Sequence, residues 1–389
     1  MESELRIGVI GTSQRGKLAD HAHKPDDRSR VVAGADIKPA ARDEFLAKYP
    51  DAFVTADWRE LAARDDVDAV FVLTPDFLHE EMAVALLKSG KSVYLEKPMA
   101  LSTEGCDNIL RAAATNTVKI FVGHNMRYMR VIRKMKELID SGAIGEVKTA
   151  WCRHFVGCGG DFYYQDWHAD RSKVHSLLLQ KGAHDLDVLH WLCGGYATRV
   201  NGMGNLTVYN KIADRHDDAP DREYNIFRGT YPPAAQTQLN PVIDVEDLSL
   251  VQMELDNGVL CTYQQCHYTP DYWRNYTIIG TEGRIENCGD DPNNGGAEIR
   301  LWNTHVRYNR DGDVQFPIEK QTGSHGGSDP DIVAEFLAYV RGDIEKTATN
   351  PIAARMAVAA GCAATESLRS DSRCVNVPPL DQSILDYFG

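Results

Sequence analysis

The sequence is poor in the features that mark secreted, membrane-spanning and nucleic-acid-binding proteins. No apolar run approaches the roughly 18–20 residues of a membrane-spanning helix, and the first residues show no basic stretch followed by an apolar core. Its 42 Lys and Arg are outnumbered by 56 Asp and Glu, which gives a formal net charge of −14. Because nucleic acids and anionic membranes attract clustered positive charge, we expect neither as a partner.

Several catalytic and metal-binding motifs are also missing. The nine cysteines include no C-x-x-C pair, which favours reduced thiols and a cytoplasmic location. The 13 histidines include no H-E-x-x-H, and G-x-S-x-G is absent, so we expect neither a metal site nor a serine hydrolase. Gly11, Gly16 and Lys17 have the spacing of a nucleotide-triphosphate loop, but Leu18 stands where that loop needs Ser or Thr to bind magnesium.

What the sequence has in its first 124 residues is a regular alternation of short apolar runs with amphipathic stretches. The stretch at 79–90 has apolar residues at helical spacing and ends in glycine. Strands alternating with helices predict a doubly wound parallel sheet with both faces covered. The expected strands are Leu5–Ile10, Arg30–Ile37, Asp68–Thr74, Lys91–Glu96 and Val118–His124.

The pattern changes after the helix expected at 129–145. Residues 248–267 read as two alternating strands around Asp256-Asn257-Gly258, a strong hairpin signal. With further strands at 276–280 and 298–302 and helices at 331–342 and 351–370, the second part is expected to be an α+β domain. We therefore predict a first domain of residues 1–124 and a second of residues 125–389, which holds a large, open, mainly antiparallel sheet.

Residues 208–244 are polar and lack periodicity. A surface insertion is the favoured interpretation. The alternative is a loop that covers the active site or a neighbouring subunit, because long loops are often functional.

The loop after the first strand fits a dinucleotide better than a triphosphate. Gly11, Ser13 and Gly16 occupy the positions of G-x-G-x-x-G, and the helix that follows offers free N–H groups to a pyrophosphate. Asp36 ends the second strand, where a carboxylate can accept hydrogen bonds from the adenosine ribose. NAD is favoured because Asp36 would repel the extra phosphate of NADP; Lys38 keeps NADP as the alternative.

Lys97 is the first candidate for chemistry. It lies in Glu96-Lys97-Pro98, at the carboxyl end of an expected parallel strand, where open sheets bind ligands. Pro98 biases Lys97 toward an extended backbone, which aims its side chain at the cleft. A solvated lysine in a turn is the alternative.

His184 is the second candidate. If its segment is helical, Gln180, Lys181 and His184 lie on one face, and Asp187 follows one turn later to fix the histidine tautomer. Removing hydride from a secondary alcohol requires removal of its hydroxyl proton, and a positioned base contributes roughly 10²–10⁴-fold. We expect His184 to accept the proton and Lys97 to stabilise the alkoxide; the reverse assignment stays open.

Several of these motifs together resemble the glucose–fructose oxidoreductase / inositol dehydrogenase / MocA family. They are Gly11 to Gly16, Thr74-Pro75 with His79, Glu96-Lys97-Pro98, KGAHDLDVLHWLCG at 181–194, DVEDLSLVQMELDNG at 244–258 and GSHGGSDP at 323–330. The resemblance implies a Rossmann domain and an α/β domain with the nicotinamide between them, and oxidation of a sugar or polyol hydroxyl. It makes Lys97 and His184 the expected catalytic pair. The family's aspartate four residues before the histidine is Gln180 here, which cannot exchange a proton near neutral pH.

The predicted site divides into two sets. The residues expected at NAD are Gly11, Thr12, Ser13, Gln14, Arg15, Asp36, Thr74, Pro75, His79, Glu96, Lys97 and Asn125. Those expected at the substrate are Lys97, Arg127, Trp167, His168, Gln180, Lys181 and His184. Aromatic residues such as Trp167 cover the apolar face of a sugar, and for Arg127 a salt bridge between domains is equally open.

Three functions follow as hypotheses. The first is an NAD-dependent oxidoreductase acting on a secondary hydroxyl or ketone of a sugar, cyclic polyol or sugar derivative. The second is an NAD-dependent glycoside hydrolase that works by transient C3 oxidation, elimination, hydration and re-reduction. The third is a non-catalytic dinucleotide-dependent sensor. For all three, the resemblance implies a homodimer or homotetramer formed through the second domain's sheet.

Overall fold

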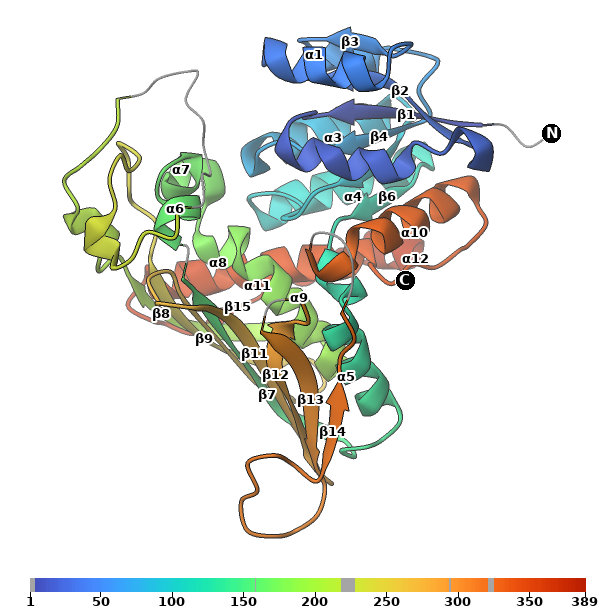
Figure 1. The fold of residues 1–389 in the computed structure, drawn as a ribbon. Coiled ribbons are helices and arrows are strands. Elements are labelled where there is room, and N and C mark those ends of the chain that lie inside the picture. The colour runs from blue at the N-terminus through green and yellow to red at the C-terminus, as the bar shows by residue number, and fades with distance from the viewer. Residues whose placement is uncertain (1–3, 158, 218–227, 294, 321–324) are drawn as a thin grey trace. The chain divides into compact units, whose positions relative to one another are not determined.

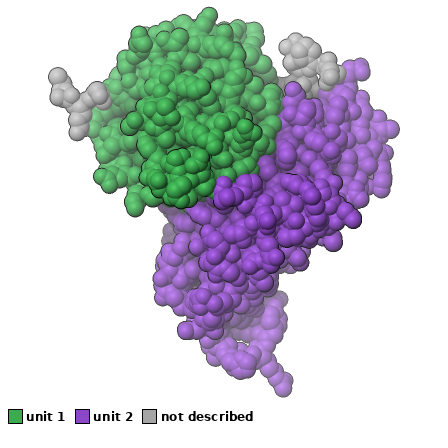
Figure 2. Space-filling model, turned by 180° about the vertical axis from the view of Figure 1, so that it is seen from behind, with its two compact units in different colours: residues 1–128, 323–355, 380–389 green, residues 129–322, 356–379 purple. Residues whose placement is uncertain are grey.

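The computed structural model describes residues 4–157, 159–217, 228–293, 295–320 and 325–389. The chain divides into two compact units (Figure 2). Unit 1 comprises residues 1–128, 323–355 and 380–389, and unit 2 comprises residues 129–322 and 356–379. The predicted domain boundary at residue 124 stays a prediction, and the contacts of the chain assign two later segments to unit 1.

Unit 1 is built on a six-stranded sheet in the order β3-β2-β1-β4-β5-β6, with every pair parallel (Figure 1). This is the strand order of dinucleotide-binding folds. The strands are β1 (Leu5–Ile10), β2 (Ser29–Ala35), β3 (Phe53–Thr55), β4 (Ala69–Val72), β5 (Ser92–Leu95) and β6 (Ile120–Val122). The helices of this unit's first segment are α1 (Pro39–Lys48), α2 (Trp58–Ala62), α3 (His79–Lys88) and α4 (Thr103–Asn116). The doubly wound sheet expected from the sequence is confirmed.

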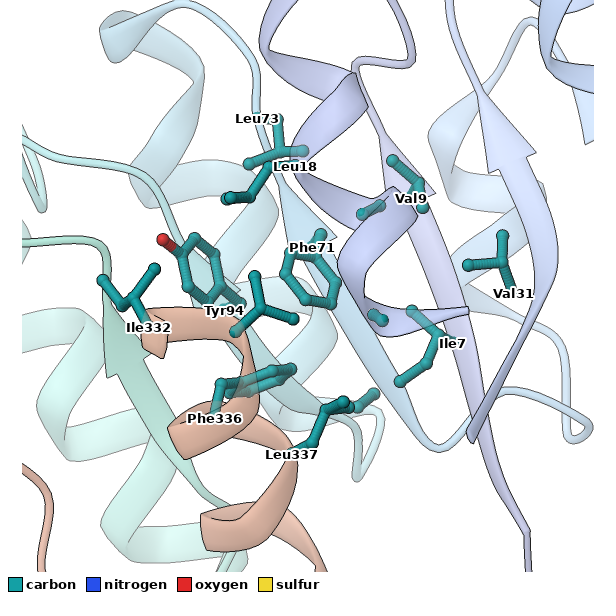
Figure 3. Packing of buried hydrophobic residues seen from close by; sticks show 14 of the residues in the cluster. Ile7, Val9, Leu18, Val31, Phe71, Leu73, Tyr94, Ile332, Phe336 and Leu337 are labelled. Atoms are coloured by element: carbon teal, nitrogen blue, oxygen red, sulfur yellow. The ribbon is translucent and has the colours of Figure 1, made fainter. Parts of the chain in front are cut away.

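The core of unit 1 joins this sheet to a helix from far along the chain. Phe71 of β4 stacks on Tyr94 of β5 with ring centroids 4.8 Å apart. Phe336, from α10 (Asp329–Arg341), meets both rings edge-on at 5.0 and 5.5 Å (Figure 3). All three side chains are fully buried. Helix α10 thus covers the strands that carry the glycine loop and the Glu-Lys-Pro element.

Unit 2 contains a nine-stranded sheet in the order β14-β13-β12-β11-β7-β10-β9-β8-β15. Its pairs are antiparallel except β7 with β10, which is parallel. The strands are β7 (Val147–Val156), β8 (Ala197–Asn205), β9 (Leu248–Leu255), β10 (Leu260–Cys266), β11 (Tyr272–Gly280), β12 (Arg284–Asp291), β13 (Gly296–Trp302), β14 (Val314–Pro317) and β15 (Val375–Asn376). Burial alternates along β7, so one sheet face is covered and the other is open. The predicted open, mainly antiparallel sheet is confirmed.

Helices of unit 2 cover one face of this sheet. They include α5 (Arg130–Asp140), which packs against β12 and β13, and α9 (Gly182–Cys193), which packs against β7 and β10. The hairpin predicted at Asp256-Asn257-Gly258 joins β9 and β10, and Gly258 has a φ of +81° that favours glycine.

The described part of the 208–244 insertion packs into an apolar cluster that it shares with neighbouring segments of unit 2. Tyr209 stacks on Tyr164 with ring centroids 4.0 Å apart, and Leu239 and Val245 are buried beside them. The buried carboxylate of Asp247 accepts hydrogen bonds from the backbone N–H groups of residues 207, 208 and 209. Residues 218–227 lie outside the described residues. In the part of the chain that is described, no helix has the length and apolar character needed to cross a membrane.

Candidate functional site

The glycine loop of unit 1 has a backbone that only glycine permits at two positions. Gly11 follows β1 with a φ of +86°, and a Cβ there would lie 2.7 Å from the carbonyl oxygen of Leu73. A Cβ on Gly16 would lie 2.7 Å from the carbonyl oxygen of Gly11. The residues that follow, Gln14–Ala22, form a 3₁₀ helix. The loop therefore approaches the neighbouring backbone closely, as a pyrophosphate-binding turn requires.

Asp36 lies directly behind this loop. One carboxylate oxygen accepts hydrogen bonds from the backbone N–H groups of Thr12 (2.9 Å) and Ser13 (3.2 Å), and the other accepts one from Lys38 (2.9 Å). The side chain is only partly buried. Asp36 therefore fixes the loop from the edge where the sequence predicts the adenosine ribose.

His79 connects two further loops at the same edge of the sheet. Its ring nitrogens lie 2.7 Å from the carbonyl oxygen of Pro98 and 2.9 Å from that of Thr74. The ring is completely buried at the start of α3. His79 thus ties the Thr74-Pro75 turn to the loop that carries Lys97, which is a positioning contact that the motif spacing alone does not reveal.

Arg15 is held by two carboxylates of unit 1. Its guanidinium lies 2.6 Å from Glu96 and 2.9 Å from Asp329, and Glu96 also accepts the backbone N–H of Lys97 at 3.0 Å. Burial alone would lower the pKa of Arg15, but Glu96 and Asp329 raise it well above its ordinary value. The arginine therefore stays charged and links the glycine loop to the Glu-Lys-Pro element. Asp329 was not among the residues predicted for this site.

The other predicted residues of unit 1 follow β6. Asn125 and Arg127 are buried in a 3₁₀ turn, Asn125–Tyr128. Arg127 donates to the backbone carbonyl of Ala348, 2.6 Å away in the same unit. Unit 1 thus holds the predicted cofactor residues together at the carboxyl ends of its strands.

The predicted residues of unit 2 surround the start of α9. Gln180 ends a short helix, Leu177–Gln180, and His184 lies in α9, so the segment is two helices with Lys181 between them. Gln180 and His184 are both buried. Lys181 itself keeps a right-handed helical backbone (φ −96°, ψ −42°), and the predicted common face of Gln180, Lys181 and His184 stays a prediction. The predicted meeting of Lys97, in unit 1, with His184, in unit 2, stays a prediction.

Trp167 and His168 lie in an aromatic segment of unit 2. The two rings are stacked with centroids 3.8 Å apart, and Tyr163 meets His168 edge-on at 5.4 Å. The Nδ1 of His168 lies 2.5 Å from the buried carboxylate of Asp166. This segment has the composition predicted for a sugar-facing wall.

Sequence reasoning missed a buried network beneath α9, centred on Asp185. One carboxylate oxygen lies 2.8 Å from both His154 Nδ1 and the Tyr263 hydroxyl. The other accepts the Tyr276 hydroxyl and lies 3.1 Å from Arg274 Nε. His154, on β7, has only strand alternation as its sequence signal. Nothing in the spacing pairs it with Asp185.

The electrostatics of this network fix the state of His154. Burial raises the pKa of Asp185, but Arg274 and His154 more than offset this and hold it below the usual range. Burial and Arg274 together lower the pKa of His154 to about 3. His154 is therefore neutral at physiological pH, with its proton on Nδ1 facing Asp185 and a lone pair on Nε2.

Two models of one family match most of the chain. Residues 5–124 match the model of an oxidoreductase family with an NAD-binding Rossmann fold, and residues 132–286 match the C-terminal domain of the same family. The chain belongs to the Gfo/Idh/MocA oxidoreductase family. The resemblance inferred from the motifs is confirmed. Among the described residues, no three His, Cys, Asp or Glu side chains gather where they could share a metal ion.

Individual relatives match over a shorter stretch. An inositol 2-dehydrogenase of Burkholderia multivorans is 36% identical over 195 residues, which are 49% of this chain and 55% of that protein. A 2,7-anhydro-N-acetylneuraminate hydratase of Mediterraneibacter gnavus is 31% identical over 212 residues, 54% of this chain and 55% of that protein. The chain spans about half the length of the curated relatives it matches.

The solved structures match over nearly the whole chain. A levoglucosan dehydrogenase in complex with NADH and levoglucosan has a TM-score of 0.76 at 19% identity, covering 96% of this chain and 100% of that one. At this identity the likeness shows the fold.

Proposed function

We propose that this protein is an NAD-dependent oxidoreductase that transfers hydride between the nicotinamide and a secondary hydroxyl or ketone of a sugar, cyclic polyol or derivative. The observation that carries the proposal is the edge of unit 1. There the Gly11 turn, the Asp36 carboxylate and the Lys97 loop are joined by hydrogen bonds and ion pairs. The positive φ of Gly11 and its close approach to the Leu73 backbone give the tight turn that precedes a pyrophosphate-binding helix.

The residues proposed to hold NAD are those predicted from the sequence. The turn from Gly11 to Gly16 would take the pyrophosphate at the start of the helix that follows it, and Asp36 would accept from the ribose. The bound nicotinamide supplies the hydride acceptor or donor. His184 then accepts the hydroxyl proton of the substrate. The ammonium of Lys97 stabilises the substrate oxygen as its negative charge develops.

Substrate recognition is assigned to both units. We propose that Arg127 of unit 1 and the group around α9 in unit 2 contact the substrate, the latter being Trp167, His168, Gln180, Lys181 and His184. Names of relatives support a polyol or sugar as the class, since two of them are an inositol dehydrogenase and a levoglucosan dehydrogenase.

The test is turnover with NAD across a panel of inositols, aldoses, anhydrosugars and glycosides, followed by the absorbance of reduced nicotinamide. We expect stoichiometric NADH with at least one polyol. Silence across the panel while NADH binding is measurable by fluorescence contradicts the proposal. The matched control replaces an exposed lysine of the same unit, Lys88→Met, alongside Lys97→Met.

The hydrolytic alternative has two observations in its favour. A relative is named a hydratase, and Gln180 leaves the position before His184 without an ionisable carboxylate. Release of aglycone from a glycoside without net NADH identifies this function. Stoichiometric NADH from a glycoside whose aglycone stays attached identifies the dehydrogenase.

We also propose a homodimer or homotetramer formed through the open face of the unit 2 sheet. Met203 of β8 and Leu250 of β9 are register neighbours and are 57% and 40% exposed, which is unusual for large apolar side chains in a solvated sheet. Light scattering at micromolar concentration tests this assembly, and a monomer contradicts it. The cysteines described in the structure are free thiols, in keeping with the cytoplasmic location that we propose.

A further inference from the structure

His175, five residues before Gln180, has a backbone conformation that residues with a side chain rarely adopt. Its φ is +64° and its ψ is −60°. Across it, the backbone N–H of Ser176 donates to the carbonyl oxygen of Val174 at 2.7 Å. These angles and this hydrogen bond define a γ-turn of positive φ, which is rare and strained for any residue that carries a Cβ.

Contacts with later segments of unit 2 hold this turn in place. The carbonyl oxygen of His175 accepts a hydrogen bond from the guanidinium of Arg369 at 3.0 Å, and Arg369 is paired with Glu246 at 2.8 Å. The hydroxyl of Ser176 lies 2.6 Å from that of Thr365. Because strained backbone persists only where its surroundings over-determine it, these contacts are what maintain the turn.

The imidazole of His175 contributes little to holding the turn. Its Nε2 is buried and has no hydrogen-bond partner among the described residues. Burial and the neighbouring Arg369 lower the pKa of His175, so the ring is neutral at physiological pH. The strain therefore belongs to the backbone and the Cβ, and a methyl group in place of the imidazole would leave it unchanged.

The turn sets the start of α8 (Leu177–Gln180). The side chain of Ser176 accepts the backbone N–H of Leu179 as the cap of this helix, and the carbonyl oxygen of Ser176 accepts that of Gln180 at 2.9 Å. Four residues are too few for a helix that is stable by itself. The place of Gln180 therefore depends on the turn that precedes α8.

The other end of α8 leads directly into the candidate site. Lys181 follows α8 with a helical backbone, and the first turn of α9 carries His184. One flank of α8 lies against α11 (Pro351–Leu368), since a Cβ on Gly361 would lie 3.2 Å from the carbonyl oxygen of Leu178. Held at its start and at its flank, α8 passes the geometry of the turn on to Lys181 and α9.

We propose that His175 is a positioning residue, whose strained turn fixes α8 and thereby the places of Gln180, Lys181 and His184. The inference rests on the proposed oxidoreductase function and adds to it a residue that needs no contact with substrate or coenzyme. With a Cβ at position 175, the neighbouring backbone conformations are sterically forbidden, so the turn has one narrow energy well. Glycine would widen this well and loosen α8.

The first test compares two replacements that both remove the imidazole. His175→Ala keeps the Cβ and the strain, whereas His175→Gly removes both. Alanine is ordinarily the more stable residue, because glycine is more flexible in the unfolded chain. At His175 we expect the reverse, with a midpoint of thermal unfolding roughly 1–3 °C higher for the glycine variant.

Exposed Ser172, in the helical backbone of α7 (Arg171–Val174), is the matched control for this test. Ser172→Ala should be more stable than Ser172→Gly, in the ordinary order. If His175→Gly is no more stable than His175→Ala, the turn is not strained and the proposal is overturned.

The second test asks whether stability and turnover change in opposite directions. With the best polyol of the panel we expect kcat of His175→Gly to be roughly 10-fold below that of His175→Ala, because a loosened α8 misplaces the residues around α9. NADH affinity should be equal in the two variants. A residue that only stabilised the fold would make the less stable variant the less active one. Equal kcat values overturn the positioning role.

Thr117→Gly is the control for the second test. Thr117 is exposed, lies at the end of α4 in unit 1 and has a φ of +54°. Its replacement also relieves a left-handed backbone, and it should leave kcat unchanged. An equal loss of kcat in this variant would show that relief of any such residue slows turnover, which also overturns the assignment to His175.

The third test is independent of turnover, so it separates failed positioning from a failed function. Amide hydrogen exchange of residues 176–184 is followed by mass spectrometry in the NADH-bound protein. Faster exchange of this segment in His175→Gly than in His175→Ala, with equal exchange in unit 1, supports the proposal even if no panel compound reduces NAD. Equal exchange of the segment in both variants overturns it.

Discussion

The polar side chains of unit 1 that surround the glycine loop are bonded within that unit, whereas part of a buried polar group in unit 2 is unmatched. In unit 1, Asp36, His79 and Arg15 are bound to backbone groups or carboxylates of the same unit. In unit 2, the side chains of His154, Gln265 and His267 leave four buried nitrogen atoms without partners among the described residues. Because an unmatched buried polar group costs about 1–3 kcal/mol, a cluster of them persists where a ligand or water matches them.

This difference corresponds to the tasks proposed for the units. A coenzyme has the same shape in every reaction, so a loop braced by its own hydrogen bonds can be ready before binding. A substrate is recognised by groups whose hydrogen-bonding capacity is left for it, and these vary between relatives on one fold. The predictions below test the two halves of this contrast separately.

Replacing Lys97 should separate coenzyme binding from chemistry most strongly. For Lys97→Met we expect turnover of the best polyol to fall by roughly 10³-fold, because the charge that stabilises the alkoxide is lost. NADH affinity should stay within about threefold. Fluorescence titration and initial rates measure both, with Lys88→Met as the control. Turnover that survives the change would remove Lys97 from the mechanism.

A methyl group in the glycine loop should damage unit 1 alone. Gly11→Ala places a Cβ 2.7 Å from the Leu73 carbonyl oxygen, whereas Gly90, with a similar φ of +79°, has no atom within 4 Å of its Cβ position. Both changes cost about 1 kcal/mol of stability through the positive φ.

Only Gly11→Ala should also weaken NADH binding, by at least about tenfold. Calorimetric titration of both variants checks this. Equal NADH affinities would mean that the loop does not approach the coenzyme.

Acid should destabilise unit 2 through His154. Its pKa is about 3 in the folded chain and about 6.5 when unfolded. The unfolded chain therefore binds more protons, and the stability due to neutral His154 is complete above pH ~6.5 and is lost as the pH falls toward 3.

Urea unfolding at pH 7, 6 and 5 should show a smaller loss of unfolding free energy for His154→Asn than for the unchanged protein. The exposed His305→Asn serves as the control. Parallel pH dependences for all three proteins would exclude the assigned state of His154.

The smallest effect is expected at Asp36. Asp36→Asn keeps an oxygen for the N–H groups of the loop and removes the charge that would repel the 2′-phosphate of NADP. The ratio of the dissociation constants for NADPH and NADH should fall roughly 3- to 10-fold. An unchanged ratio would show that Asp36 braces the loop without reading the ribose.

The contrast also explains what the sequence could predict. The Gly11 loop, Asp36 and the Lys97 loop are short motifs, each at the end of a strand, and strand order brings such ends together. The role of α10 was hidden because Phe336 lies more than 200 residues after the sheet it covers. Local patterns carry no information on such a long-range contact.

In unit 2 the sequence indicated the hairpin and His184 but not what surrounds them. His154, Asp185 and Tyr263 come from three elements, and their pairing depends on strand register that no local spacing encodes. Recognition residues that sit on different strands are therefore harder to predict than a loop built from consecutive residues.

The most direct test follows a single isotope through the reaction. The protein is given NAD and a panel of polyols deuterated at their ring carbinol carbons, and the reduced nicotinamide is analysed by mass spectrometry. The account predicts one deuterium at nicotinamide C4 from at least one polyol, and a rate of deuterium transfer that is lower by roughly 10³-fold for Lys97→Met, and strongly reduced for His184→Gln, at the same NAD occupancy. Bound coenzyme that never acquires deuterium from any of them would contradict it.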